Sequence, residues 1–379
     1  MSRGLQSLAL KFFVWCGLPI ALAVIVSPPA SADTAGSYLA GLHKHELLGS
    51  MIPVNGDQNP YAIFVAPVSS GAIKAGDVLV DNFNARSNYQ GTGTTIMDYH
   101  PATKQVSLLA SIPAKLDGCP GGTGLTTAMA MLKSGWIIVG SAPSADGTTK
   151  TLGQGCLIVL DSNGKVASTI TGPDISDPWG NMAVIDKGDA ASLFVSNVGF
   201  GIGGPGQAPV SQATVLRLDL KIPDGKPPVV TRHTAIASGF SAQPDASVFL
   251  IGPTGLALSD DGTLYVSDAI GNRVVAIDEA ATRTDSAGTG REVSAGGMLK
   301  RPLAMTFAPN GDLLVINALN GQVVEMDPKS GTQRGAQWID ADAAQSPPGS
   351  GDLFGIAMTP DGKGFYYVED DANTLMLAK

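Results

Sequence analysis

Small polar side chains recur at one place in six segments of this sequence, and they are the residues best suited to chemistry. They are Asn82, Ser141, Asn197, Asp268, Asn317 and Asp370. Amide and carboxylate oxygens bind hard cations such as calcium and magnesium, and they also hydrogen-bond sugars and peptides. Alternatively, Asn and Asp side chains accept hydrogen bonds from the backbone of a tight turn. We expect this structural role for most of the six.

Two further stretches contribute candidate ligand contacts. The segment "DNFNARSNYQGTG", residues 81–93, is long and rich in Asn, and "DPWGN", residues 177–181, precedes another apolar run. Long insertions on one face of a repeat array often form its binding surface. The candidate contacts from these stretches are Asn84, Arg86, Tyr89, Trp179 and Asn181.

The polar residues belong to a repeated pattern. The segment "GPTGLALSDDGTLYVSDAIGNRVVAID", residues 252–278, contains two strands joined by an Asp-Gly turn, a polar elbow and a third strand, and it returns as "RPLAMTFAPNGDLLVINALNGQVVEMD", residues 301–327. Asp-Gly and Asn-Gly supply the positive φ angles that tight hairpins need. Matching the first strands gives six units that start near residues 62, 129, 182, 256, 305 and 356.

These units predict an all-β fold, a six-bladed β-propeller. Each unit offers short strands without a helical period, and segments such as Leu264 to Val266 are apolar on both faces, as in strands buried between stacked sheets. A single long β-sandwich is the competing fold, but it would not explain one hairpin frame six times. We find no linker or charge block, so residues 33–379 are expected to form one domain.

The last unit ends in its third strand, at "TLMLAK". An unpaired outer edge there would invite association with other chains. The segment His43 to Val54 precedes the first unit and can supply the missing strand. We therefore expect the N-terminal segment to close the ring.

Residues 1–32 have the three-part layout of a secretory signal peptide. Arg3 and Lys11 precede an apolar run over residues 12–26, and Ala32 ends the expected cleavage site. The alternative is a retained membrane anchor, but the run is shorter than the roughly 20 residues of a spanning helix. A secreted or periplasmic protein is expected, with no membrane span after cleavage.

Two cysteines remain after the leader, Cys119 and Cys156. An even pair in an oxidising compartment predicts a disulfide, with two free thiols as the alternative. Both positions lie at the same end of the second predicted blade, so a bridge is geometrically sensible. The formal net charge of −9 disfavours nucleic acid and anionic lipid as partners. We expect a monomer.

The units at Gly252, Arg301 and Gly351 resemble NHL repeats, and more distantly the gluconolactonase and regucalcin propellers and the streptogramin lyases. For the lactonase group, the resemblance implies a divalent metal held by a Glu, by an Asn of a "PNG" motif and by an Asp of a "DG" motif. Here the two alignable positions read 253–255, "PTG", and 302–304, "PLA". The lyase group uses a His near the elbows, and none lies there. The resemblance thus supports the fold and counts against these chemistries.

The sequence therefore predicts a secreted NHL-type propeller that binds a small molecule or a protein on its elbow face, with enzymatic activity left open. The alternative is a metal-dependent lactonase or lyase with a rearranged ligand set, for which calcium or magnesium would be the cofactor. That ligand set would come from Asn82, Asn197, Asp268, Asn317 and Asp370. A scaffolding protein of the cell envelope is a third hypothesis, favoured if its own side chains fill the elbow face.

Overall fold

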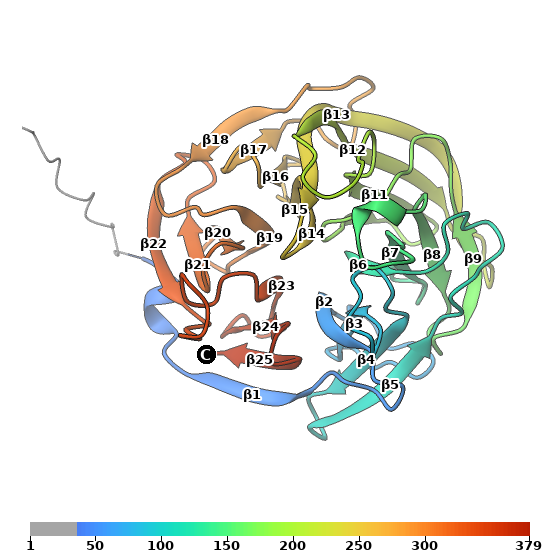
Figure 1. Ribbon diagram of the computed structural model, residues 1–379, viewed down its shortest axis with the longest axis horizontal. Helices are drawn as coiled ribbons and strands as arrows, with labels where there is room; N and C mark the ends of the chain where they lie inside the picture. Colours follow the sequence, from blue (N-terminus) through green and yellow to red (C-terminus); the bar gives the residue numbers. More distant parts are fainter. Residues whose placement is uncertain (1–35) are drawn as a thin grey trace, which may run out of the picture. The chain divides into compact units, whose positions relative to one another are not determined.

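The structure, a computed structural model, describes residues 36–379, which belong to one compact unit, Asp33–Lys379. Six antiparallel sheets are arranged around a central axis (Figure 1). The fold is the predicted six-bladed β-propeller. The signal peptide predicted over residues 1–32 lies outside the described residues.

In blades 1, 2, 4 and 5 the strands follow one another in chain order from the axis outward, while blade 3 has a fifth, short strand, Phe249–Ile251, that lies near the axis (Figure 1). Blades 1 and 2 contain β2 (Gln58–Val65), β3 (Val78–Asn84), β4 (Thr95–His100), β5 (Gln105–Ser111), β6 (Leu125–Met131), β7 (Ile137–Ser141), β8 (Cys156–Leu160) and β9 (Val166–Ile170). Blade 3 contains β10 (Ala183–Asp186), β11 (Ala190–Asn197), β12 (Val210–Lys221), β13 (Val229–Asp245) and the short β14 (Phe249–Ile251). The turn η2 (Thr149–Thr151) lies between β7 and β8.

Blades 4 and 5 follow the same four-strand plan. Their strands are β15 (Pro253–Leu258), β16 (Leu264–Asp268), β17 (Arg273–Ile277), β18 (Arg291–Ala295), β19 (Pro302–Phe307), β20 (Leu313–Asn317), β21 (Gln322–Met326) and β22 (Gln333–Trp338). Blade 6 has β23 (Leu353–Met358), β24 (Phe365–Glu369) and β25 (Thr374–Ala378), and its outer strand is β1 (His45–Ser50), which follows the turn η1 (Leu39–Gly41).

The predicted closure of the ring is confirmed. Strand β1 pairs antiparallel with β25, from His45 opposite Ala378 to Ser50 opposite Thr374. Figure 1 shows β1 running along the outside of β25, with the C-terminus beside it. The edge that the last unit would leave unpaired is therefore covered by a strand from the start of the described chain.

The blades are held together by apolar side chains between neighbouring sheets. The middle strands, such as β16, are buried along their whole length, which explains why they are apolar on both faces. At the axis the innermost strands approach one another closely. A Cβ on Gly255 would lie 2.2 Å from the carbonyl oxygen of Leu303 in the next blade, so the repeat needs a small residue there.

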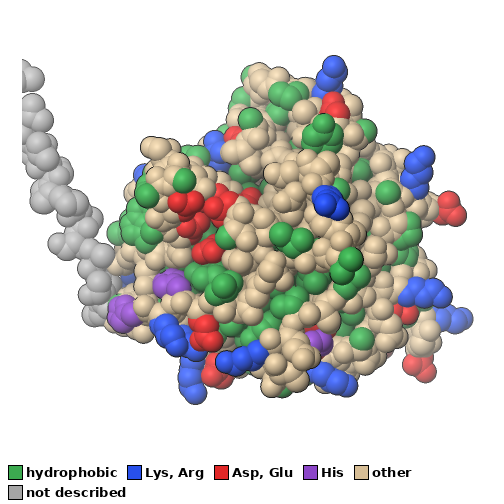
Figure 2. Space-filling view, turned by 60° about the horizontal axis from the view of Figure 1, so that its bottom comes forward, with side chains coloured by type: hydrophobic (Ala, Val, Ile, Leu, Met, Phe, Trp, Pro, Cys, Tyr) green, Lys and Arg blue, Asp and Glu red, His purple; other side chains and the backbone are tan. Residues whose placement is uncertain are grey.

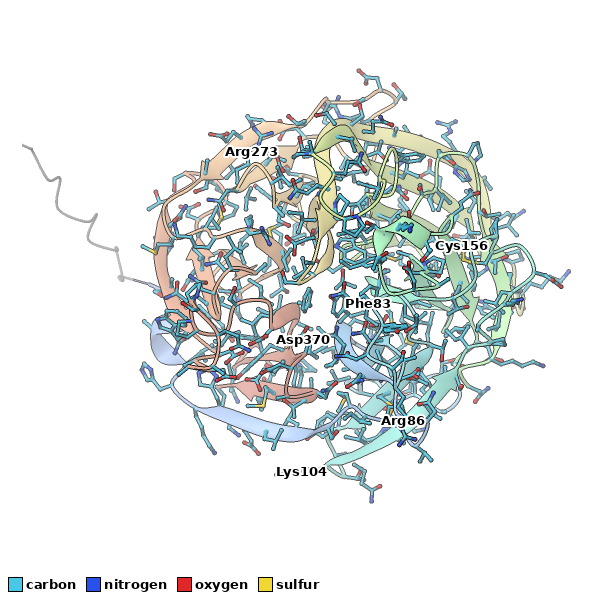
Figure 3. All side chains as sticks on the ribbon, in the orientation of Figure 1. Phe83, Arg86, Lys104, Cys156, Arg273 and Asp370 are labelled. Atoms are coloured by element: carbon cyan, nitrogen blue, oxygen red, sulfur yellow. A yellow bond between two sulfur atoms is a disulfide. The ribbon has the colours of Figure 1, made fainter. Side chains whose placement is uncertain are left out.

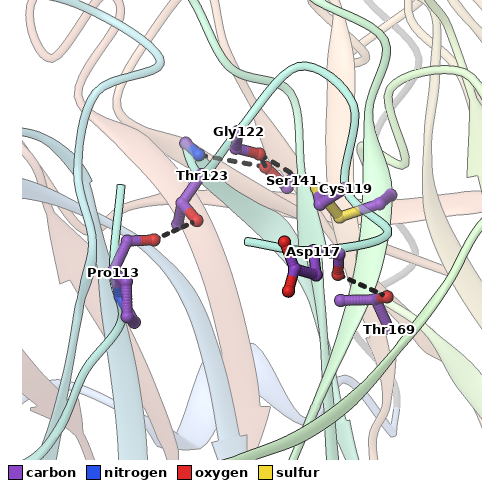
Figure 4. The surroundings of a disulfide bond; sticks show 9 residues. Pro113, Asp117, Cys119, Gly122, Thr123, Ser141 and Thr169 are labelled. Atoms are coloured by element: carbon purple, nitrogen blue, oxygen red, sulfur yellow. Dashed lines mark hydrogen bonds between the residues drawn. A yellow bond between two sulfur atoms is a disulfide. The ribbon is translucent and has the colours of Figure 1, made fainter. Parts of the chain in front are cut away.

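The predicted disulfide is present. Cys119 and Cys156 are bridged with an S–S distance of 2.01 Å. The bridge ties the connection that enters blade 2 to the first residue of β8, as Figure 4 shows. Beside it, the Ser141 hydroxyl donates to the carbonyl of Gly122 at 3.0 Å. No helix among residues 36–379 is long and apolar enough to cross a membrane.

Candidate functional site

The elbows and the starts of the innermost strands lie at one end of the propeller, here called the elbow face. Strand β2 shows why, because its first residue, Gln58, pairs with the last residue of β3, Asn84. Side chains from the elbows and from the connections that enter each blade therefore reach the same face. Any site built from elbow residues has to lie there.

At the axis, the elbow-face end of the channel is filled by the protein's own aromatic side chains. Tyr61 and Phe354 stack with ring centroids 3.9 Å apart. Phe83 meets both Phe249 and Trp179 edge-on, with ring centroids 5.4 and 5.6 Å apart, and Phe249 stacks on Trp179 at 6.1 Å. All five rings are at least 98% buried. This aromatic plug removes the axial opening at the elbow face, and Figure 3 shows Phe83 close to the axis.

Five of the six polar elbow residues bond to the local backbone. Asn82 donates to the carbonyl of Met51 at 2.9 Å, and Asn317 accepts from the amide of Lys300 at 2.8 Å. Within residues 36–379, no hydrogen bond joins two of the six predicted residues. Bonds to backbone atoms are also made by Ser141, Asn197 and Asp268.

In blade 6 the register assigns the elbow position to a different residue. Leu353 pairs with Glu369 in the way that Pro302 pairs with Asn317 in blade 5. Asp370 therefore lies one residue beyond the equivalent position. This displacement sends the Asp370 side chain into a pocket instead of into its own elbow turn.

The other predicted contacts are dispersed. Arg86 and Tyr89 are exposed in the β3–β4 loop, and Figure 3 shows Arg86 away from the axis. Trp179 belongs to the aromatic plug. Asn181 lies in the channel below the plug, where its amide donates to the carbonyl of Leu256 at 2.7 Å. Among these candidates only Asn84 lines the elbow-face pocket.

That pocket lies off the axis, between blades 1 and 6, and has a volume of about 400 Å³. Its walls come from the start of β2, the β3–β4 loop, the long β22–β23 connection and the β24–β25 turn. Only polar side chains and glycine line it, and none of them is Lys, Arg or His. Among the lining residues are Asn59, Asn84, Gln345, Asp352, Asp370 and Asp371.

Three carboxylates form an acidic cluster at this pocket. Asp340, Asp352 and Asp371 each place one oxygen so that the three lie within 4.8 Å of one another. Asp340 and Asp352 are buried, whereas Asp371 is exposed and gives the cluster access to solvent. Figure 2 shows acidic side chains gathered in one patch on the surface.

Burial and mutual repulsion raise the pKa values of the carboxyl groups around this pocket. Burial, reinforced by the charges of Asp371 and Asp340, raises the pKa of Asp352 to about 8. Burial and the charge of Asp352 raise the pKa of Asp370 well above its usual range. Burial and Asp340 raise the pKa of Glu369 to about 7. The pocket therefore holds protons near neutral pH that isolated carboxyl groups would have lost.

Several buried oxygens at the pocket have no hydrogen-bond donor. They are Asn59 Oδ1, Asn84 Oδ1 and Gln345 Oε1, while the carboxyl oxygens Asp340 Oδ2 and Asp352 Oδ2 have no donor other than each other. Buried acceptors without partners are rare because each costs about 1–3 kcal/mol. A hard cation accepts such carboxylate and amide oxygens as ligands. The donor set thus fits a divalent cation of the calcium type.

Sequence reasoning missed the acidic cluster itself. Asp340 and Asp352 are the two ends of "DADAAQSPPGSGD", in a connection that is much longer than the equivalent one between β18 and β19. Its length and its acidic residues were the available signal. What they could not reveal is that this loop meets Asp371 of the following elbow.

A second cavity occupies the axis at the opposite end of the propeller. It has a volume of about 710 Å³ and is lined by the ends of all six innermost strands. Its side chains are mostly apolar, including Met129, Met305 and Phe307, and Asn181 lies among them. It offers no cluster of ionisable groups.

No known protein family matches this sequence. No curated protein matches it either. Solved structures do share its fold. A gluconolactonase from Xanthomonas campestris superposes with a TM-score of 0.56 at 14% identity, over 93% of this chain and 94% of that chain.

Two other solved structures show how varied the proteins with this fold are. A calcium-binding protein, regucalcin, from Agrobacterium tumefaciens has a TM-score of 0.50 at 11% identity, over 88% of this chain and 93% of that chain. A PQQ-bound aldose sugar dehydrogenase from Streptomyces coelicolor has a TM-score of 0.52 at 14% identity, over 88% and 97% of the two chains. The predicted resemblance to gluconolactonase and regucalcin propellers is therefore confirmed for the fold, while function has to be argued from the site.

Proposed function

We propose that this protein is an exported, monomeric binding protein that holds a divalent cation of the calcium class in its elbow-face pocket, and with it a small polyhydroxylated ligand. The observation that carries the proposal is the convergence of Asp340, Asp352 and Asp371 within 4.8 Å. No basic side chain lines the pocket to neutralise them. Calcium typically binds six to eight oxygens, and the unpartnered amide oxygens nearby extend the set.

The chemistry of the remaining wall supports a sugar-like ligand. Asn59, Asn84 and Gln345 present side-chain oxygens that lack donors, and hydroxyl groups of a ligand can supply them. The volume of about 400 Å³ lies in the range of roughly 300–1,000 Å³ that is usual for small-molecule sites. The disulfide supports export, because such bonds persist in oxidising compartments.

The first test is a calcium titration of the chelator-treated protein by calorimetry. We expect one calcium site and an increase in melting temperature with calcium, because a ligand that binds only the folded state stabilises it. Asp371→Asn should weaken calcium binding at least tenfold, and it should fold normally because Asp371 is exposed. Asp285→Asn, which removes an exposed carboxylate of blade 4, is the matched control.

The ligand is tested with D-glucose, D-gluconate and D-glucono-1,5-lactone, each added with calcium and with chelator. Binding that requires calcium and is lost in Asp371→Asn supports the proposal. Unchanged calcium affinity in Asp371→Asn, or the absence of any calcium binding, would refute it.

A second candidate function is hydrolysis of a lactone in the same pocket. The specific observation in its favour is Asp352, a buried carboxyl group in the lining of the pocket, whose carboxylate can act as a general base once a cation has replaced its proton. Its carboxylate would take a proton from water as the oxygen attacks the ring carbonyl, and return it to the alkoxide as the ring opens to a hydroxy acid. A bound cation would polarise the carbonyl. Calcium-dependent acid release from D-glucono-1,5-lactone, absent in Asp352→Asn, distinguishes this function from binding alone.

A further inference from the structure

A second cluster of metal-ligating side chains lies in blade 1, at the end of the sheet opposite the elbow face. Asp77 immediately precedes β3, and Asp98 and His100 lie on β4. Residues two apart on a strand point to the same side of the sheet, so Asp98 and His100 share one side. Asp77 reaches them because Val78 and Tyr99 are paired. Figure 3 labels Lys104, which lies in the turn that follows His100.

The three side chains converge on a small volume. Their ligand atoms all lie within 4.8 Å of one another. His100 Nδ1 is 3.0 Å from Asp77 Oδ2 and 3.8 Å from Asp98 Oδ1. Ligand atoms bound at about 2.0–2.2 Å in a tetrahedral zinc site are about 3.3 Å apart. The observed separations lie on either side of that value, so small side-chain movements would complete the geometry.

One of these atoms lacks any partner. Asp98 is 2% exposed, and its Oδ1 accepts no hydrogen bond. This orphaned oxygen is the atom that faces His100 Nδ1. Asp77 is also buried, and the only ion pairs of both carboxylates among residues 36–379 are with His100. Two buried carboxylates thus share one imidazole.

Neighbouring groups orient the donor atoms. The Asp77 carboxylate accepts from the backbone amide of Lys74 at 2.7 Å. The other ring nitrogen of His100, Nε2, lies 3.2 Å from the Ser107 hydroxyl. Nδ1 lies within hydrogen-bonding distance of Asp77 Oδ2, at 3.0 Å, and a metal ion would replace this contact while Nε2–H donates to Ser107, the arrangement usual for metal-bound histidines. The His100 side chain is 26% exposed, so an ion can enter from solvent.

We propose that Asp77, Asp98 and His100 form a binding site for a zinc-class divalent ion, separate from the acidic cluster of the elbow face. One nitrogen and two oxygens suit zinc, which imidazole favours over calcium. A water molecule from the exposed side of His100 would complete four-coordination. The site would cross-link the start of β3 to the end of β4 and stabilise blade 1.

The competing interpretation is an ordinary His–Asp pair, and the chain contains a matched example. His233 Nδ1 lies 2.9 Å from Asp174 Oδ2 in a more exposed pair, and no second carboxylate is within ion-pair distance among the described residues. If a single His–Asp pair were enough to bind zinc, both sites would behave alike. His233→Gln is therefore the control variant.

The experiment is a zinc titration of tag-free, chelator-treated protein, followed by cobalt binding, which reports the coordination through visible absorption. We expect one zinc site in the unmodified protein and in His233→Gln. His100→Gln, at a partly exposed position, should weaken zinc binding at least tenfold and abolish the cobalt spectrum. Asp98→Asn should do the same where circular dichroism shows that it is folded.

The proposal is overturned if the unmodified protein binds no zinc, or if His100→Gln binds it as tightly as the unmodified protein. Zinc binding should persist in Asp371→Asn, since that change affects only the elbow-face cluster. A negative result for the calcium site therefore does not decide whether the zinc site exists, and the reverse also holds.

Discussion

At the scale of single residues, the elbow-face pocket illustrates how burial changes what a carboxyl group does. Asp285 and Asp352 are the same residue type, but the Asp285 side chain is 81% exposed, whereas Asp352 is buried among other acids. Water stabilises the charge of the Asp285 carboxylate. In the pocket, a proton or a cation has to offset the charge of Asp352.

This difference predicts a pH dependence of stability. The pKa of Asp352 rises from 3.8 in the unfolded chain to about 8 in the folded one, so between these values the folded state retains a proton that the unfolded state loses. The contribution is fully present below pH about 4 and is lost as pH rises through about 8. With chelator present, the melting temperature should fall by several degrees between pH 6 and 9.

Two comparisons check the assignment. Asp352→Asn cannot titrate, so its melting temperature should fall less over the same range. Saturating calcium should also flatten the curve, because the cation replaces the proton. A profile in Asp352→Asn that matches the unmodified protein would show that other groups cause the pH dependence.

At the scale of elements, the N-terminal segment is attached at two places. Strand β1 completes blade 6, and the preceding residues contact blade 5 through Glu325 on β21. The buried Glu325 carboxylate accepts from the amides of Tyr38 and Leu39 at 2.7 and 2.9 Å, and from the hydroxyl of Ser37 at 2.6 Å. The Glu325 side chain thus accepts hydrogen bonds from the backbone N–H groups at the start of the turn η1.

Removing this acceptor should loosen the closure. Glu325→Ala leaves the amides of Tyr38 and Leu39 without their partner, and an unsatisfied buried donor costs about 1–3 kcal/mol. We expect the free energy of unfolding to fall by at least that amount in denaturant melts, with earlier proteolysis near η1. Glu292→Ala on the exposed outer strand β18 should change it by less than about 0.5 kcal/mol.

The elements were predictable to different degrees. The closing strand could be inferred because the sixth repeat lacks a partner for its third strand, and the disulfide because Cys119 and Cys156 fall at one end of one blade. The position of Asp370 relative to its elbow could not be predicted. The β23–β24 hairpin, which contains "DGKG", is one residue longer than the β19–β20 hairpin, and only the pairing register shows which residue takes the elbow position. Strand β14 was also missed, because three residues carry too little pattern.

At the scale of the whole molecule, the aromatic plug decides where a ligand can bind. Tyr61 and Phe83 come from blade 1, Trp179 and Phe249 from blade 3 and its entry, and Phe354 from blade 6, and the five rings meet at the axis. They close the axial channel at the elbow face. The polar pocket on this face lies toward blades 1 and 6, and a smaller pocket of about 300 Å³ lies among the elbows of blades 3, 4 and 5.

Truncating the plug should destabilise the whole ring. Phe83 is fully buried, and Phe83→Ala should lower the free energy of unfolding by about 3–5 kcal/mol, as for other buried aromatic residues. Tyr89→Ala, six residues later in the exposed loop, should cost less than about 0.5 kcal/mol. Chemical denaturation of both variants measures the difference. Similar losses in the two would mean that the plug does not bear on stability.

The sequence by itself determined the number of blades, the strand that closes them and the pairing of the cysteines. These features follow from local hairpin chemistry repeated at intervals, and from the need to pair every edge strand. Only the tertiary structure decided which polar residues meet. Asp340 and Asp352 lie at the two ends of one connection and Asp371 lies in the next elbow, while Asp77 precedes β3 and His100 ends β4. Such convergence depends on how sheets twist and pack around an axis, and no short stretch of sequence encodes that geometry.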